Sequence, residues 1–269
     1  MTTETFTHGS LSLTYGITGA GSEVVLAFHG FGQSPDVWER WSTAIPASKH
    51  MLSIGLFGHG TSSFPLSRMK KRPLEKAEWS ELIAALLESR GIHQVEIWAY
   101  SMGSRMAMSF IERYPERVRR MTLFAPDGLK RNLLYRFACE TALGRWLFDQ
   151  GLRHDQVLIG LIAMLSRMRF MPHRLGQFLS DQLSSKDRRV MVYESWLIHR
   201  RLFPSTDLRK FQGQGIVCFG QHDAVIPPRL RKNAERLFAG QVKMVDSPFG
   251  HRMLTPEFAD WLVQQTWWV

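Results

Sequence analysis

The sequence predicts an α/β fold with a mostly parallel, twisted sheet, helices on both of its faces and an inserted helical cap. Three observations favour this fold. Short apolar runs alternate with helical stretches, this alternation stops over residues 129–205, and reactive side chains directly follow several of the apolar runs. Strands separated by helical stretches imply a mostly parallel sheet that is covered on both faces.

The expected elements outside residues 129–205 alternate between strand and helix. The expected strands are short segments with apolar residues at 11–15, 24–28, 50–54, 95–98, 118–124, 216–219 and 242–245. The first run alternates in polarity, which is typical of an edge strand, whereas 24–28 is the first buried strand. Helices are expected over residues 35–42 and 75–90, and Gly91 ends the second of them.

The most informative motif is AYSMG at residues 99–103, which follows one expected strand and begins a helix-like run. A serine on a sharp strand-to-helix turn, with small residues two before and two after it, is typical of a nucleophile elbow. The small neighbours allow strand and helix to approach closely around a strained serine. Ala99 stands where the pattern usually has glycine and is nearly as small. Ser101 is therefore the candidate nucleophile.

Two later segments supply partners for this serine. A serine hydroxyl becomes nucleophilic when a histidine takes its proton and a carboxylate orients that histidine. Asp223 follows the apolar run 216–219, and His251 lies in the loop beyond the run 242–245. Both lie just past the carboxyl ends of expected strands, where open α/β sheets build their sites. We therefore expect His251 to be the base and Asp223 the orienting acid.

Two backbone groups are expected to form an oxyanion hole. Attack on an ester or amide carbonyl creates an oxyanion that needs preorganised hydrogen-bond donors. The N–H of Met102, directly after the nucleophile, is expected to supply one donor. The first buried strand ends in HGFG at residues 29–32, and the N–H of Phe31 in this loop is expected to supply the other.

Five segments, in this order, resemble the α/β-hydrolase-fold family over nearly the whole length of the chain. They are HGFGQSPDVW (29–38), GLFGHGTSS (55–63), AYSMGSR (99–105), FGQHDAVIP (219–227) and FGH (249–251). The family usually has an acidic residue shortly before the G-H-G turn, where this chain has Gly55, Leu56 and Phe57. This departure concerns a structural turn. The resemblance implies a serine hydrolase that resembles a carboxylesterase.

The resemblance also bears on Asp127 and on two early histidines. Some members of this fold place the acid after the strand that here ends before Asp127, so this residue is the alternative to Asp223. Its other interpretation is a turn residue in the sequence Pro-Asp-Gly. His29 and His59 lie in glycine-rich turns, where such residues in the family hold loops by hydrogen bonds. His29 is also a candidate substrate contact.

Residues 129–205 have helical spacing and no strand pattern, and they occupy the place of a helical cap in the family. The hydrolase core is then expected at residues 1–128 and 206–269. A cap of this kind shapes the pocket and excludes water. Its candidate lining residues are apolar: Trp146, Leu158, Ile162, Leu165, Met168, Phe170 and Trp196. The alternative is that most of them pack the cap onto the core.

The positive charge of the chain is concentrated in the same region. The formal net charge is +10, and residues 129–210 hold fifteen Lys or Arg against seven Asp or Glu. Three interpretations stay open, namely a solvated face, an anionic substrate, and an acidic partner or membrane surface. Nucleic-acid binding is not expected, because no basic run is interleaved with aromatic residues in a recognisable module.

Arg105 indicates an alternative reaction, that of a lyase with an anionic substrate. It lies four residues, about one helical turn, after Ser101. The menaquinone-pathway lyase of this fold carries a similar S-x-G-G-R sequence whose arginine contacts an anionic substrate, although Ser104 replaces one glycine here. The HGFG and DVW segments look equally like carboxylesterases such as the biotin-pathway methyl esterase. A noncatalytic binding module on the same fold is a further alternative.

Composition agrees with a single compact enzyme. With 269 residues and 44% apolar content, the chain can bury a large core as one domain. Cys139 and Cys218 show no paired spacing, no signal-like start is visible, and the apolar run 157–165 is too short to span a bilayer. We expect a cytoplasmic enzyme that acts on a small acyl compound and requires neither a metal nor an organic cofactor.

Overall fold

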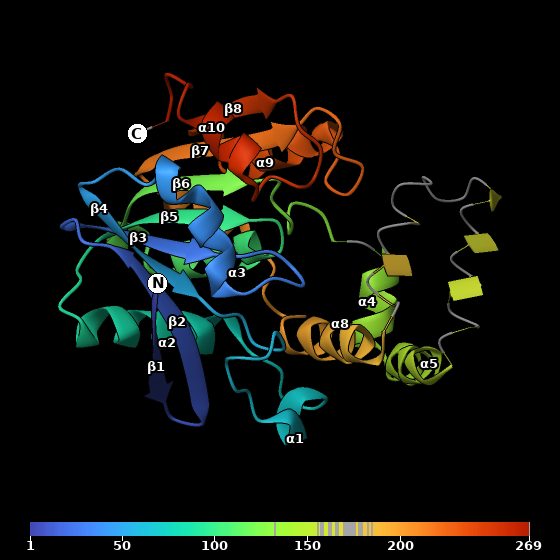
Figure 1. Cartoon of the computed structure of the whole chain (residues 1–269). Helices are drawn as coiled ribbons and strands as arrows, with labels where there is room; N and C mark the ends of the chain where they lie inside the picture. Colours follow the sequence, from blue (N-terminus) through green and yellow to red (C-terminus); the bar gives the residue numbers. More distant parts are fainter. Residues whose placement is uncertain are drawn as a thin grey trace.

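The computed structural model is built on an eight-stranded sheet (Figure 1). It describes residues 1–268 except 132, 155, 157, 158, 161, 162, 165, 166, 169–175, 177–179, 182 and 184. Four of the residues expected to line a pocket, Leu158, Ile162, Leu165 and Phe170, lie outside the described residues.

The strand order is β1-β2-β4-β3-β5-β6-β7-β8. The strands are β1 (Thr2–His8), β2 (Leu11–Gly19), β3 (Glu23–Phe28), β4 (Lys49–Ile54), β5 (Val95–Tyr100), β6 (Val118–Phe124), β7 (Gln214–Gly220) and β8 (Val242–Ser247). β2 pairs antiparallel with β1 and with β4, and every pair from β4 to β8 is parallel. The predicted mostly parallel sheet is therefore confirmed.

The expectation of an edge strand at residues 11–15 is wrong. β2 lies one place inside the sheet, and β1 covers its outer side. β1 was not predicted because its sequence, TTETFTH, has a single apolar residue. Every one of its residues is exposed or half-buried. An edge strand of this kind follows no burial pattern that periodicity detects.

Helices cover both faces of the sheet. They are η1 (Pro35–Ala44), α1 (Leu66–Met69), α2 (Lys76–Ser89), α3 (Gly103–Arg113), η2 (Pro115–Arg117), η3 (Thr206–Lys210), η4 (Pro228–Leu230), α9 (Arg231–Leu237) and α10 (Pro256–Leu262). Phe28 packs on Trp79 of α2, whereas Trp98 packs on Trp38 and Trp41 of η1. Since Phe28 lies beside Ala99 in the sheet, it points to the face opposite Trp98. The segment expected as a helix at 35–42 is a kinked 3-10 helix.

The cap segment (residues 129–205) follows β6 and precedes β7 in the chain, and its described helices lie to one side of the sheet (Figure 1). Its described part contains α4 (Leu133–Glu140), α5 (Ala142–Arg153) and α8 (Lys186–Ile198), and no strand. α8 packs directly on the core, because a Cβ at Gly58 would lie 2.8 Å from the backbone nitrogen of Ser195. The described helices agree with the helical spacing of this region, whereas the domain boundaries stay a prediction.

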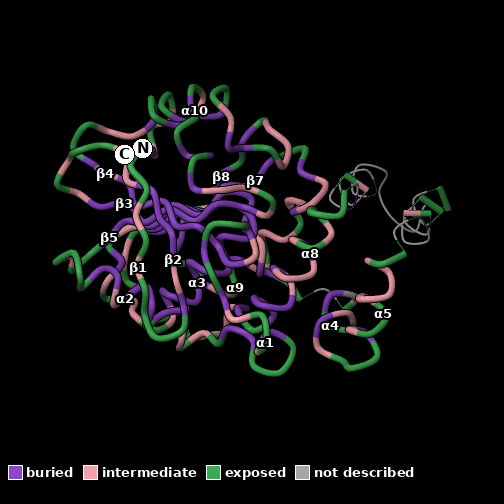
Figure 2. Tube along the Cα trace, turned by 60° about the horizontal axis from the view of Figure 1, so that its bottom comes forward, coloured by how far each residue is buried: buried purple, intermediate pink, exposed green. Residues whose placement is uncertain are grey.

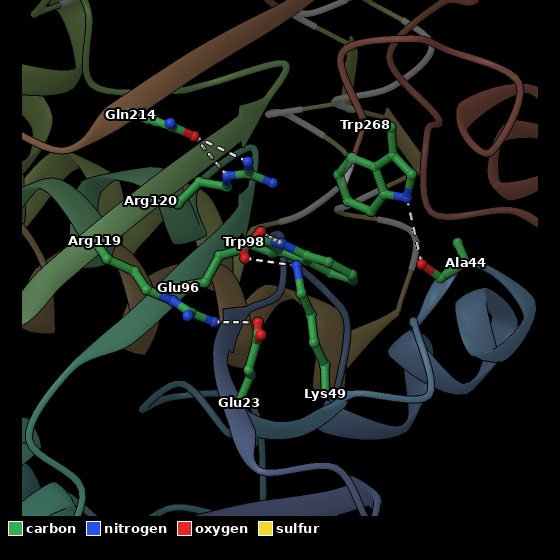
Figure 3. Close-up of polar contacts among 9 residues, drawn as sticks. All are labelled: Glu23, Ala44, Lys49, Glu96, Trp98, Arg119, Arg120, Gln214 and Trp268. Carbon is green, nitrogen blue, oxygen red and sulfur yellow. Dashed lines mark hydrogen bonds and ion pairs between the residues drawn. The ribbon is translucent and has the colours of Figure 1, made fainter.

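A buried ion pair lies at the amino ends of the parallel strands (Figure 3). Lys49 begins β4, and its Nζ lies 2.7 Å from Glu96 Oε2 on β5, with both side chains about 5% exposed or less. The indole N–H of Trp98 donates to Glu96 Oε1 at 2.6 Å. Reactive residues follow the opposite, carboxyl ends of the strands, so we assign this pair to stability.

Replacing Lys49 alone is expected to destabilise the fold by about 3–5 kcal/mol, because Glu96 would stay buried without its counter-charge. In urea unfolding, Lys49→Met should show this loss, and the double variant Lys49→Met/Glu96→Gln should recover most of it. Arg119→Met is the matched control, since Arg119 pairs with Glu23 at the same end but both are 40% exposed. Equal losses in the single variant and the control would contradict this assignment.

Candidate active site

Ser101 lies on a strained turn between β5 and α3. Its backbone φ is +48°, in the left-handed region that a non-glycine residue rarely adopts. The turn is held by Ser101 N–H, which donates to Phe124 O, and by Asp127 N–H, which donates to Ser101 O. A Cβ at Gly103 would lie 2.5 Å from the carbonyl oxygens of Phe28 and His29. The small residue two positions after the serine is therefore a steric requirement.

The structure brings Ser101, His251 and Asp223 together. Ser101 Oγ lies 3.0 Å from His251 Nε2, and His251 Nδ1 lies 2.8 Å from Asp223 Oδ2. The Asp223 side chain is fully buried and that of His251 is 13% exposed. Because the carboxylate accepts a hydrogen bond from Nδ1–H, the proton of the neutral ring stays on Nδ1, and Nε2 has a lone pair that faces the serine hydroxyl.

Backbone groups hold the carboxylate in this orientation. Asp223 Oδ1 accepts hydrogen bonds from the N–H groups of Val225 at 2.7 Å and Ile226 at 2.8 Å. These bonds occupy one carboxylate oxygen and leave Oδ2 for His251. The loop after β7 therefore orients the acid before any substrate arrives.

The alternative acid, Asp127, is engaged elsewhere. Its Oδ2 forms an ion pair with Arg105 of α3, and its Oδ1 accepts the Gly128 N–H at 2.6 Å. The Arg105 guanidinium carbon lies 4.2 Å from the ring centre of Phe203 and 5.0 Å from that of Tyr135. Burial opposes its charge, but attraction to Asp127 and Tyr135 outweighs burial and raises the pKa of Arg105. Arg105 of α3 thus contacts Tyr135 and Phe203 of the cap segment, and its expected contact with an anionic substrate stays a prediction.

The loop after β3 is closed by its own polar groups. Gly30 N–H donates to Gln33 Oε1 at 2.8 Å, and Gly32 adopts a φ of +73° that favours glycine. His29 Nδ1 lies 2.8 Å from Gly30 O, and its Nε2 accepts the Leu56 N–H at 3.1 Å. His29 is fully buried, and burial lowers its pKa to about 3. These contacts hold the loop, and the expected contact of His29 with substrate stays a prediction.

The two expected oxyanion donors lie in elements that the structure places around Ser101. Met102 directly follows the serine and is the N-cap of α3, where the first N–H groups of a helix have no intrahelical acceptor. Phe31 follows Gly30, and its half-buried ring meets the edge of His59 at 5.5 Å. The donor roles of both residues stay a prediction.

Tyr100 joins the parts of this site and was missed in the sequence. Its hydroxyl donates to the backbone oxygen of His251 at 2.6 Å. A Cβ at Gly30 would lie 2.7 Å from its ring, so the ring packs against the loop after β3. Tyr100 thereby links the nucleophile turn, that loop and the histidine loop. Its place inside the elbow motif was visible, but its long-range partner lies 151 residues away.

The three cap residues expected to line a pocket have different surroundings. Trp196 of α8 is half-buried, and its ring lies 5.4 Å from that of Phe148 and 5.1 Å from that of Tyr135. Trp146 and Met168 are 58% and 57% exposed. Their expected contact with a substrate stays a prediction. The α5 residues that pack towards the core are Phe148 and Leu152, and Trp146 lies on another face of that helix.

Comparison with known proteins identifies the family of this chain. The family model for the alpha/beta hydrolase fold matches residues 23–255. The chain is 36% identical over 110 residues to a putative 2-succinyl-6-hydroxy-2,4-cyclohexadiene-1-carboxylate synthase of Bacillus subtilis, over 40% of this chain and 39% of that protein. It is 27% identical over 115 residues to a 2-hydroxymuconate semialdehyde hydrolase of a Pseudomonas species, over 42% of this chain and 39% of that protein. The chain thus spans about two fifths of the length of these relatives.

Among solved structures, a thermophilic esterase from Thermogutta terrifontis is similar with a TM-score of 0.67 at 20% identity, over 98% of this chain and 95% of that chain. The chain belongs to the α/β-hydrolase-fold family. Two of the proteins that it is similar to are named as hydrolases. Within the described residues, no helix has the length and apolar content to cross a membrane. The same residues include no group of three or more His, Cys, Asp or Glu placed to hold a metal ion.

Proposed function

We propose that this protein is a serine hydrolase that cleaves a carboxylic ester or a related acyl compound. Ser101 Oγ attacks the carbonyl carbon while His251 Nε2 takes the hydroxyl proton, and Asp223 stabilises the imidazolium that forms. The N–H groups of Phe31 and Met102 donate to the oxyanion. His251 then protonates the leaving group. Water, activated by the same histidine, hydrolyses the acyl-enzyme and releases the acid.

The observation that carries this proposal is the ordered hydrogen-bond chain from Ser101 through His251 to Asp223, with spacings of 3.0 and 2.8 Å. A serine that merely begins a helix needs neither partner. The positive φ of Ser101 adds support, because backbone strain of this kind is concentrated at functional sites. The same complete set argues against a noncatalytic binding module.

The surroundings of the oxyanion loop support an apolar acyl group. Phe31 packs against a small apolar cluster of the cap segment that includes Leu183, Val192 and Trp196. We propose that residues 129–205 form a cap over a core of residues 1–128 and 206–269, and that Trp196 contacts the substrate. The cytoplasm stays the predicted location, and the predicted chemistry uses protein groups alone.

Pre-steady-state hydrolysis of nitrophenyl esters tests the proposal. Wild type is expected to release a burst of nitrophenol equal to the enzyme concentration on at least one acyl length, because acylation precedes slower deacylation. Ser101→Ala should show no burst and should not be labelled by a fluorophosphonate. Turnover that persists in Ser101→Ala would refute the assignment of the nucleophile.

A lyase of the menaquinone-pathway type is the second candidate, because the chain is 36% identical over 110 residues to a protein named as such a synthase. Such a lyase would use His251 as a base for elimination and would form no acyl-enzyme. Against it stands Arg105, whose guanidinium is taken up by Asp127 and two aromatic rings. Fluorophosphonate labelling of Ser101 without a burst on any ester would favour this candidate over ester hydrolysis.

A further inference from the structure

Helix α5 carries apolar side chains on two opposite faces. Phe148 and Leu152 point inward and pack in the apolar cluster that includes Trp196 of α8. Leu143 and Leu147, one helical turn apart, lie on the opposite face and are 60% and 45% exposed. Trp146 lies beside them and is 58% exposed. Apolar side chains on an exposed helix face are normally covered, and among the described residues nothing covers the outer face of α5.

The neighbouring helix α4 carries two more exposed apolar side chains. Leu133 and Phe137 lie one turn apart and are 76% and 41% exposed. The two helices pack closely there, because Gly144 of α5 lies against the backbone of Phe137. We name the five exposed residues Leu133, Phe137, Leu143, Trp146 and Leu147 the outer cap face. Figure 2 shows α4 and α5 side by side at the end of the molecule, away from the buried strands.

Exposed apolar residues are unusual in the rest of the described chain. Eleven large apolar side chains are exposed among the residues that the structure describes, and eight of them lie between residues 133 and 190. Contiguous exposed apolar surface on a monomer marks a binding surface more often than single exposed residues do.

The same helices are basic. Residues 130–153 contain five Lys or Arg against two Asp or Glu. Arg131 and Arg136, 45% and 51% exposed, share the single carboxylate of Glu140 at 3.8 and 3.7 Å. Arg153, 68% exposed, lies 3.1 Å from Asp149. Exposed pairs of this kind are weak, so their guanidinium groups are available to an anionic surface.

We propose that the outer cap face docks on an anionic phospholipid surface. The combination of Trp, Phe and Leu on one face with Arg at its border is the pattern of helices that lie in the membrane interface. Tryptophan prefers the headgroup level, and each nearby Lys or Arg gains attraction to anionic lipid. The five residues of the outer cap face are not part of the triad. The proposal therefore does not depend on the proposed function.

The positive charge of this region favours an anionic bilayer over a second copy of the chain as the partner. Two copies that met through this face would bring two basic regions together, and like charges at short range repel. An anionic bilayer matches both the charge and the apolar side chains. An acidic protein would match the charge but would leave unexplained why apolar side chains dominate the outer side of α5.

Vesicle co-sedimentation tests the proposal with the full chain carrying Ser101→Ala, so that lipid turnover cannot alter the vesicles. Binding to vesicles with 30% phosphatidylglycerol is expected, with at least ten-fold weaker binding to pure phosphatidylcholine and a clear loss at high salt. Leu143→Ser/Trp146→Ser should reduce binding to the anionic vesicles at least ten-fold. Leu66→Ser, on α1 and 53% exposed, is the matched control and should bind as the parent does.

A second variant distinguishes a loss of binding from a loss of folding. Arg136→Gln/Arg153→Gln should weaken binding to anionic vesicles and reduce its salt dependence, while thermal unfolding shows that both variants fold. The proposal is overturned if the parent does not bind anionic vesicles or if Leu143→Ser/Trp146→Ser binds them as well as the parent does. It is also overturned if sedimentation velocity shows a dimer that Leu143→Ser/Trp146→Ser converts to a monomer, because the face then binds a second copy.

Discussion

Asp223→Asn is expected to lower kcat for a nitrophenyl ester by about 10³–10⁴-fold with little change in KM. Asp223 Oδ1 is held by two backbone N–H groups, so the amide of asparagine must turn its NH2 group towards His251. That NH2 group donates to Nδ1 and forces the proton onto Nε2. The imidazole then has no lone pair that faces Ser101, and the base is lost although the fold is kept.

Asp127→Asn is the matched control, because Asp127 is the alternative acid and its carboxylate pairs with Arg105. This variant should keep kcat within about ten-fold of wild type, since its side chain contacts neither His251 nor Ser101 in the structure. Its thermal midpoint should fall, because the Arg105 guanidinium would stay buried without its counter-charge. If Asp127→Asn lost activity as Asp223→Asn does, the assignment of the acid would be wrong.

The free energy of unfolding is expected to fall steeply as the pH is lowered from about 6.5 towards 4. Burial lowers the pKa of His29 and of His199 to about 3, and that of His59 to about 4. In the unfolded chain the same imidazoles bind protons below about pH 6.5. The unfolded state therefore holds up to three more protons in this range. Linkage then predicts a loss of about 4 kcal/mol per pH unit near pH 5, and no such loss above pH 7.

Urea unfolding at a series of pH values measures this slope. Each of these histidines has Nδ1 near a backbone oxygen. His199 Nδ1 lies 2.8 Å from Ser195 O, and His59 Nδ1 lies 3.1 Å from Phe57 O. His199→Gln should reduce the slope near pH 5 by about one third, because one titrating group is removed. His8→Gln, at an exposed position of β1, should leave the slope unchanged. A flat profile between pH 6.5 and 5 would contradict the neutral state of these three side chains.

Much of the sheet was predictable from sequence because buried parallel strands are short segments rich in apolar residues. The runs at 24–28, 50–54, 118–124 and 216–219 all fall within observed strands. β1 was missed for the opposite reason, since its largely polar sequence is stabilised by pairing with β2 and not by burial. Backbone pairing leaves no signature in side-chain periodicity.

The candidate site was predictable where it depends on which residues follow the strands along the chain. It was not predictable where it depends on the direction in which a side chain points. Ser101, Asp223 and His251 each follow a strand, and parallel strands bring their carboxyl ends to one edge of the sheet. Tyr100 escaped because its partner is a backbone oxygen in a distant loop. Arg105 and Trp146 were expected at the substrate, but one is taken up by Asp127 and the other lies on the outer cap face.

The sequence by itself determined the fold class, the elbow serine and the candidate residues of its partners, because local patterns and strand order are written along the chain. The tertiary structure decided which aspartate meets His251 and which face of α5 is covered. The physical reason is the same in both cases. Two carboxylates that each follow a strand, or two apolar faces of one helix, are both visible in the sequence, and only the packing of distant segments shows which of them meets its partner.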